Sequence, residues 1–147
     1  NPSSEPHGNS LHQHASENLR DFIQSGKLQQ DHDPSFYLYE ITMGKHIQTG
    51  IVAAVSIEEY NQGLIKKHEF TRPDKENDRT RHIEVTNANT GPVFLTYRNC
   101  GQFQNEISEI KKQSPDVSFT ADDETIHTLW KTNLVNQLNL LKNFISI

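Results

Sequence analysis

The densest cluster of side chains that could bind an anion or move a proton lies in residues 64–82, LIKKHEFTRPDKENDRTRH. These nineteen residues hold two histidines, six lysines or arginines and four acidic residues, so they are locally positive in a chain of net charge −5. Pro73 suits the first position of a helix, and the residue before a proline is held extended. We therefore expect a helix from Pro73 to about Ala88, with Asp74 and Glu76 favoured near its positively polarised start.

Helical spacing places three of these side chains on one face. Arg79 and His82 follow Lys75 by four and seven residues, and Arg72 stands at the mouth of the helix. An arginine grips an oxoanion with two parallel hydrogen bonds, whereas a lysine supplies a point charge, and the free amides of a helix start add further donors. The pattern predicts that Arg72, Lys75, Arg79 and His82 bind a small anionic ligand such as a phosphate or carboxylate.

The residues just before this helix carry groups that can exchange a proton. His68 or Glu69 would act as general acid or base, because either can transfer a proton when its surroundings shift its pKa toward the working pH. Asp78 lies off the cationic face and would orient Arg79 or hold a magnesium ion. No HxxxH spacing accompanies the two histidines of this stretch, so a transition-metal centre is not indicated.

The same composition is also typical of a solvated helix face, on which weak ion pairs contribute about 0.3–0.5 kcal/mol each. Two classes of function therefore remain open. One is a phosphate- or nucleotide-handling enzyme, and the other is a non-catalytic interaction or regulatory domain. In the second class the charges would dock a partner chain or the remaining segments of a longer protein. A concave surface around Lys75, Arg79 and His82 would favour the first.

Composition limits the setting of the protein. A chain of 147 residues with net charge −5 is long enough for one core, and its charge argues against general binding to nucleic acids or anionic membranes. It has no apolar run of membrane-spanning length, and the single cysteine, Cys100, fits a reducing, cytoplasmic location. We expect a disordered segment at 1–10 and a single domain at 11–147. The last helical pattern stops on apolar residues, so we expect a fragment of a longer protein.

The periodicity of apolar residues predicts helices alternating with strands. Ser10 should cap the first helix, whose His12 and His14 point to different sides and should be solvated. Ser56 and Glu59 form a capping box at a short helix. The fold class is α/β or α+β, with a mixed sheet of about five strands that includes a hairpin and is flanked by helices. The expected strands are 35–43, 46–55, 93–97, 117–120 and 125–132, and the expected helices are 11–25, 56–63, 73–88, 102–112 and 133–145.

Four segments of the chain resemble a known family. They read SFYLYE, QTGIVAAVSIEEY, GLIKKHEFTRPDKENDRTRHI and NANTGPVFLTYR. The family is the bacterial and archaeal one catalogued as domain of unknown function 1015, and the resemblance runs from about Leu11 to Ile147. Its His-Glu-x-Thr-x-x-x-Lys-Glu-x-Asp-Arg pattern is met by His68, Glu69, Thr71, Lys75, Glu76, Asp78 and Arg79.

The resemblance raises the expectation of a site at residues 64–82. Members of the family are longer and carry an upstream Pro-Tyr-Asp motif and a downstream Ala-Asp-Gly-His-His-Arg motif, both absent from this sequence. The downstream motif is similar to the phosphate loop of the ParB and sulfiredoxin superfamily, which includes nucleotidases and a free-serine kinase. The resemblance thus implies a kinase- or phosphatase-like role linked to serine metabolism, with a nucleotide and magnesium as cofactors.

Overall fold

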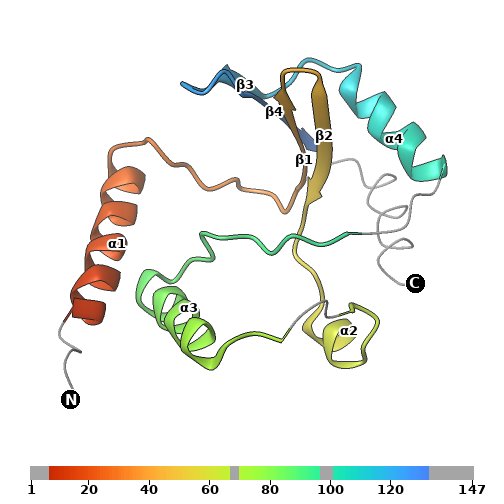
Figure 1. The fold of residues 1–147 in the computed structure, drawn as a ribbon. Coiled ribbons are helices and arrows are strands. Elements are labelled where there is room, and N and C mark those ends of the chain that lie inside the picture. Colours follow the sequence, from red (N-terminus) through yellow and green to blue (C-terminus); the bar gives the residue numbers. More distant parts are fainter. Residues whose placement is uncertain (1–6, 67–69, 97–100, 133–147) are drawn as a thin grey trace. The chain divides into compact units, whose positions relative to one another are not determined.

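The computed structural model describes residues 7–66, 70–96 and 101–132 (Figure 1). These residues divide into two compact units, each built from two separate stretches of the chain. The first, here called the helical unit, draws on Asn1–Gln30 and Lys67–Thr96. The second, the sheet unit, draws on Asp31–Lys66 and Tyr97–Ile147.

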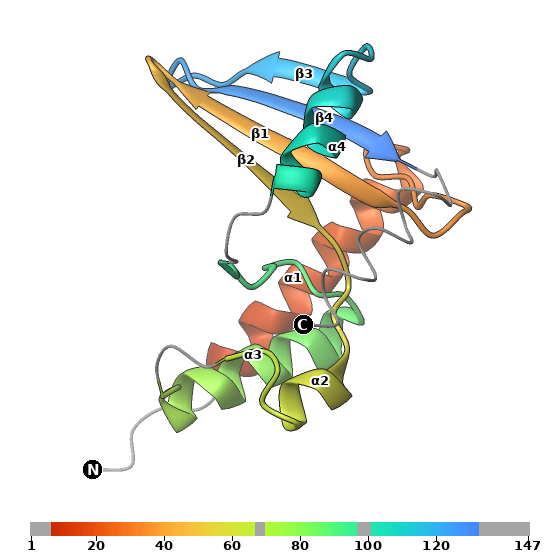
Figure 2. The same cartoon turned by 90° about the vertical axis from the view of Figure 1, so that its right-hand side faces the viewer.

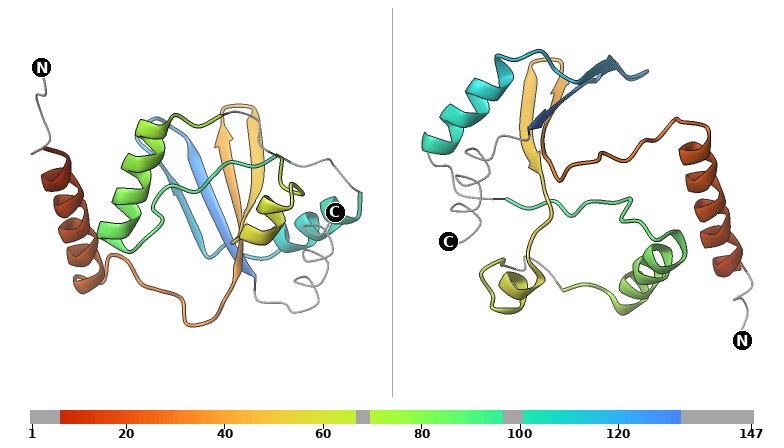
Figure 3. Two further views of the ribbon diagram at one scale, coloured as in Figure 1. Left: turned by 90° about the horizontal axis from the view of Figure 1, so that it is seen from below. Right: turned by 180° about the vertical axis from the view of Figure 1, so that it is seen from behind.

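The helical unit contains helices α1 (His7–Gln24) and α3 (Pro73–Thr86). The two helices contact each other and lie side by side in the left-hand view of Figure 3. Helix α1 begins at His7, so the expected cap Ser10 lies inside it, as do the last residues of the segment expected to be disordered. A capping side chain contributes only about 1 kcal/mol, which does not prevent a helix from continuing past it.

Helix α3 follows its prediction closely. Arg72, the residue before Pro73, is extended with φ −79° and ψ 131°. The helix ends where Asn87 takes the left-handed conformation, with φ 52°, and donates its N–H to the Ile83 carbonyl. Asparagine is one of the few residues that tolerate this conformation, so the stop is encoded locally.

The sheet unit is built on four strands: β1 (Phe36–Met43), β2 (His46–Val52), β3 (Val117–Thr120) and β4 (Ile126–Thr132). Their order is β2-β1-β4-β3, and every neighbouring pair is antiparallel. The expected hairpin joins β1 to β2 through Gly44 and Lys45, with Gly44 at φ 57°. Helices and a hairpin-containing sheet confirm the α+β class.

Two details of the expected sheet are corrected. The sheet is antiparallel throughout rather than mixed, and it has four strands in the described part of the chain rather than five. Residues 93–96, expected as a strand, are not assigned to one, and they belong to the helical unit. An apolar, β-branched run becomes a strand only when another strand pairs with it, and sequence alone does not supply that partner. The expected helix at 133–145 lies outside the described residues, as does Cys100.

The core of the sheet unit lies between one face of the sheet and helix α4 (Gly101–Lys111), which crosses that face in Figure 2. Leu38 of β1 and Trp130 of β4 oppose each other in the sheet, and Ile107 and Ile110 of α4 pack with them. Leu38 is 1% exposed. The indole N–H of Trp130 donates to the Gln113 carbonyl at 3.0 Å, so the buried ring leaves no polar atom unpaired.

The opposite face of the sheet carries polar and aromatic side chains. Asp31 receives hydrogen bonds from the Lys131 ammonium, at 2.6 Å, and from the Tyr37 hydroxyl. These bonds hold the pKa of Asp31 below its usual value and raise the pKa of both Tyr37 and Lys131. Tyr39 bonds the ring nitrogen Nδ1 of His127 at 2.6 Å. This face is thus held together by pairs between side chains of neighbouring strands and loops.

The remaining described helix is α2 (Ile57–Asn61). Its N-terminal cap is Ser56, whose hydroxyl accepts from the Glu59 amide at 3.3 Å, as the capping-box pattern predicts. None of the described helices combines the length and the apolar character needed to span a membrane.

Candidate functional site

The helical unit buries a histidine where α1 meets α3. His12 of α1 is only 6% exposed, and its Nε2 lies 3.2 Å from Oδ1 of Asp78 on α3. The Asp78 side chain itself remains largely exposed. A buried imidazole beside a carboxylate is oriented by it, because the carboxylate accepts the N–H and fixes which ring nitrogen carries the proton.

A second histidine completes this cluster. The ring of His82 meets that of His12 edge to face, with 5.6 Å between the ring centroids. His82 Nε2 also lies 3.0 Å from the Thr90 hydroxyl. Asp78 and His82 are four residues apart on α3, so both project toward the same stretch of α1. We call His12, Asp78, His82 and Thr90 the histidine cluster.

The turn after α3 brings Thr90 and Gly91 back along the helix. Thr86 fixes this turn, because its hydroxyl donates to the His82 carbonyl at 2.7 Å and also contacts the backbone of Ala88. A methyl group added to Gly91 would lie 3.5 Å from Nη1 of Arg79, so the guanidinium rests against a position without a side chain. Arg79 is therefore adjacent to the histidine cluster.

The cationic side chains on and beside α3 differ in whether they have a carboxylate partner. Arg72 is bound by both carboxylate oxygens of Asp74, at 3.1 and 2.7 Å, and Arg81 pairs with Glu84 at 3.4 Å. Lys75 and Arg79 make no ion pair or hydrogen bond with any residue that the structure describes. They lie one turn apart on an exposed surface, so both cations are available to an incoming anion.

Comparison with known proteins decides the family. The family model "Protein of unknown function (DUF1015)" matches residues 1–146. The chain belongs to this family. The match covers almost the whole chain and confirms the resemblance carried by its four segments. Neither the search of curated proteins nor that of solved structures gave a match.

The site residues predicted for this DUF1015 chain fall into three groups. Arg79, His82 and Asp78 come together at the histidine cluster, with exposed Lys75 on the next turn of the same helix. Arg72 lies at the helix start, as expected, but its guanidinium is already bonded to a carboxylate. His68 and Glu69 lie outside the described residues, so their assignment as general acid or base stays a prediction.

The prediction from the sequence missed that His12 belongs to the cluster. The expectation that His12 is solvated is wrong, whereas His14 is exposed as expected and pairs with Glu17. His12 precedes Ala15 by three residues and Leu19 by seven, so it lies on the stripe of α1 that packs against α3. That spacing is the one signal that could have placed His12 inward.

The sequence also predicts that Asp78 holds magnesium or orients Arg79. The structure brings it to His12. Within residues 7–66, 70–96 and 101–132, no group of three or more histidine, cysteine or acidic side chains is arranged to hold a metal ion. A magnesium role for Asp78 stays a prediction, and the contact that the structure supplies is the bond to the imidazole.

Proposed function

We propose that this chain is part of a phosphate- or nucleotide-handling enzyme, in which the α3 face of Lys75, Arg79 and His82 binds the anionic group of the ligand. One observation carries the proposal. Of the four described cations on or beside this helix, Arg72 and Arg81 have carboxylate partners, whereas Lys75 and Arg79 have none among the described residues. Two adjacent cations without carboxylate partners together attract an anion. An oxoanion suits them because it accepts charge-assisted hydrogen bonds from both.

The chemistry of each group suits this role. Arg79 offers two parallel N–H donors, and its guanidinium rests against Gly91. Lys75 supplies a flexible point charge one turn away. The His82 imidazole, anchored by Thr90, is able to donate a hydrogen bond to an anion. In this proposal His68 or Glu69 remains the general acid or base, and Asp78 acts on the site through His12.

The experiment is a thermal-shift measurement on the full chain. Inorganic phosphate, ATP, ADP, CTP and phosphoserine are each added, with and without magnesium. A ligand present at 100 times its dissociation constant stabilises the folded state by about 2.7 kcal/mol, which is several degrees for a chain of this size. Arg79→Ala should lose this shift, and Arg20→Ala, which removes an exposed arginine of α1, should keep it.

The proposal fails if none of these compounds raises the melting temperature. It also fails if Arg79→Ala responds as the unmodified chain does. Repeating the measurement in 0.3 M sodium chloride separates specific binding of the anion from diffuse electrostatic attraction. Binding through hydrogen bonds persists at this salt concentration better than attraction between exposed charges, which salt screens.

A second candidate is a non-catalytic interaction domain. The observation that favours it is the apolar surface of the helical unit, where Phe94 is 70% exposed and Val93 77%. Ile23 and Leu11 of α1 are exposed as well. In this alternative the α3 charges dock a partner chain or other segments of a longer protein. A pull-down of such a partner that is lost in Lys75→Glu but kept in Arg20→Glu would support the interaction domain over the enzyme.

A further inference from the structure

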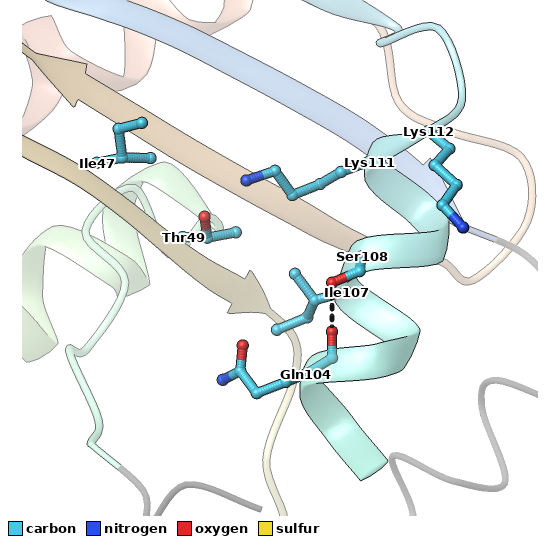
Figure 4. Close-up of a pocket in the computed structure, with 7 residues that line it drawn as sticks. All are labelled: Ile47, Thr49, Gln104, Ile107, Ser108, Lys111 and Lys112. Atoms are coloured by element: carbon cyan, nitrogen blue, oxygen red, sulfur yellow. Dashed lines mark hydrogen bonds between the residues drawn. The ribbon is translucent and has the colours of Figure 1, made fainter. Parts of the chain in front are cut away.

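The sheet unit has an open cavity that the proposed function does not use. It lies between the edge strand β2 and helix α4 and has a volume of about 520 Å³, within the usual range for small-molecule sites (Figure 4). One wall is formed by Ile47 and Thr49, which share a face of β2. The other wall is one face of α4, from Gln104 to Lys111.

Lys111, which lines this cavity, is held in a charged pair with Glu40. The Lys111 ammonium, drawn in Figure 4 reaching over the sheet, bonds Oε2 of Glu40, and the Thr49 hydroxyl donates to the same oxygen at 2.7 Å. The Glu40 side chain is 13% exposed. Burial disfavours its charge, but the hydrogen bonds from Lys111 and Thr49 outweigh burial and hold the pKa of Glu40 below its usual value. Glu40 is therefore ionised at neutral pH, and its negative charge cancels the positive charge of Lys111.

The polar side chains that line the cavity keep unused hydrogen-bonding capacity. An ammonium has three N–H donors, and Glu40 uses one of those of Lys111. The Thr49 hydroxyl donates to Glu40, which leaves its own oxygen able to accept. The Ser108 hydroxyl donates to the Gln104 carbonyl at 2.8 Å, which leaves its oxygen free to accept. The lining of the cavity thus offers both donors and acceptors.

Apolar side chains supply the rest of the lining. Ile47 is 59% exposed at the β2 side, and Ile107 is buried on the α4 side, where it joins the core. A ligand that fits these walls presents C–H groups to the isoleucines and groups that both donate and accept hydrogen bonds to the polar side chains. Hydroxyl groups meet the second requirement, because each has one donor and two acceptor lone pairs.

We propose that the cavity between β2 and α4 binds a small neutral polyhydroxylated molecule, a sugar or polyol, through Lys111 and the Thr49 and Ser108 hydroxyls. An anion fits less well. Lys111 is neutralised by Glu40, and Lys112, which also lines the cavity, pairs with Glu109 at 2.5 Å. The cavity therefore lacks an excess positive charge, in contrast to the α3 face.

The test is saturation-transfer NMR on the full chain with D-glucose, glycerol and butanoate as separate probes. Glucose or glycerol should receive saturation from the protein. Ile47→Trp fills the cavity from a largely exposed position and should reduce the signal at least fivefold. Gln48→Trp is the matched control, because the neighbouring side chain lies on the opposite face of β2 and should leave the signal unchanged.

A second variant addresses the polar contacts. Thr49→Val keeps the shape of the side chain, removes its hydroxyl and should weaken glucose or glycerol binding several-fold. The proposal is overturned if neither polyol receives saturation, if Ile47→Trp and Gln48→Trp behave alike, or if butanoate alone binds. None of these variants touches α3, so the outcome is independent of the test of phosphate binding.

Discussion

His12 depends on a single polar partner among the described residues, which makes the bond between His12 and Asp78 a test of how α1 is held on α3. Removing the carboxylate leaves a buried imidazole N–H without an acceptor, and such a loss costs about 1–3 kcal/mol. We predict that Asp78→Ala lowers the free energy of unfolding by this amount. Urea titration followed by circular dichroism at the helix band measures it.

Asp74→Ala is the control for that substitution, because Asp74 lies on the same helix and its pair with Arg72 is exposed. An exposed pair contributes at most about 1 kcal/mol. Equal effects of the two substitutions would mean that His12 gains nothing from its carboxylate neighbour.

Glu40 gives a prediction about pH. Its pKa in the folded chain lies below the ordinary glutamate value of 4.5, because the bonds from Lys111 and Thr49 overcome the effect of burial. A carboxyl group whose pKa is lowered by folding stabilises the folded chain fully at a pH above its ordinary pKa. This stabilisation is lost as the pH falls through the pKa of the folded chain. We predict that the stability difference between the unmodified chain and Glu40→Gln shrinks from pH 7 to pH 3. Urea titrations at several pH values check this, and a constant difference would contradict it.

Local spacing predicted part of the candidate site. Arg79 and His82 were placed on one helix face by counting residues, and the structure brings both to the histidine cluster. His12 was missed because its burial depends on which stripe of α1 meets α3, a contact between residues 66 positions apart. Thr90 reaches His82 only because Asn87 reverses the chain, and its role depends on that turn.

At the scale of elements, the β1–β2 hairpin depends on the backbone of Gly44. Its φ of 57° is disfavoured for residues with a side chain, even though a Cβ there would meet nothing within 4 Å. We predict that Gly44→Ala lowers the free energy of unfolding by about 1–2 kcal/mol through backbone strain alone. Gly50→Ala is the matched control, since Gly50 has open space and no positive φ. Thermal unfolding of both variants compares them, and equal melting temperatures would rule out strain at the turn.

The packing of α4 on the sheet depends on Leu38. A Leu→Ala change at a fully buried position costs about 2–5 kcal/mol. We predict a loss in this range for Leu38→Ala and less than about 0.5 kcal/mol for Met43→Ala, an exposed residue of the same strand. Trp130 is the only tryptophan and packs in the same core, so its fluorescence reports the unfolding of the sheet unit directly.

The boundaries of most elements could be predicted because each has a local signal. β-Branched and aromatic residues mark β1, an acidic turn precedes β4, Pro73 starts α3 and Ser56 caps α2. The strand order could not be predicted in the same way, because β1 pairs with β4 across a separation of about 90 residues. The stretch 93–96 has strand composition without a strand partner, and pairing is decided by the fold rather than by propensity.

At the scale of the whole molecule, the two candidate sites belong to different units and carry different charge. The α3 face in the helical unit offers two cations with no described partner, whereas the cavity in the sheet unit carries charges that cancel. A chain of net charge −5 that binds an anion must do so at a local positive surface, because its overall field repels anions. The α3 face meets that requirement within residues 64–82.

The central claim is that an oxoanion binds at the α3 face. The most direct measurement is a titration of the full, ¹⁵N-labelled chain with inorganic phosphate and with ATP, followed by the amide shifts in NMR spectra. We predict saturable shifts concentrated at residues 72–82 and 87–91, which Arg79→Ala abolishes and Arg20→Ala preserves. Saturable shifts confined to other residues, or the absence of any saturable shift, would contradict the account.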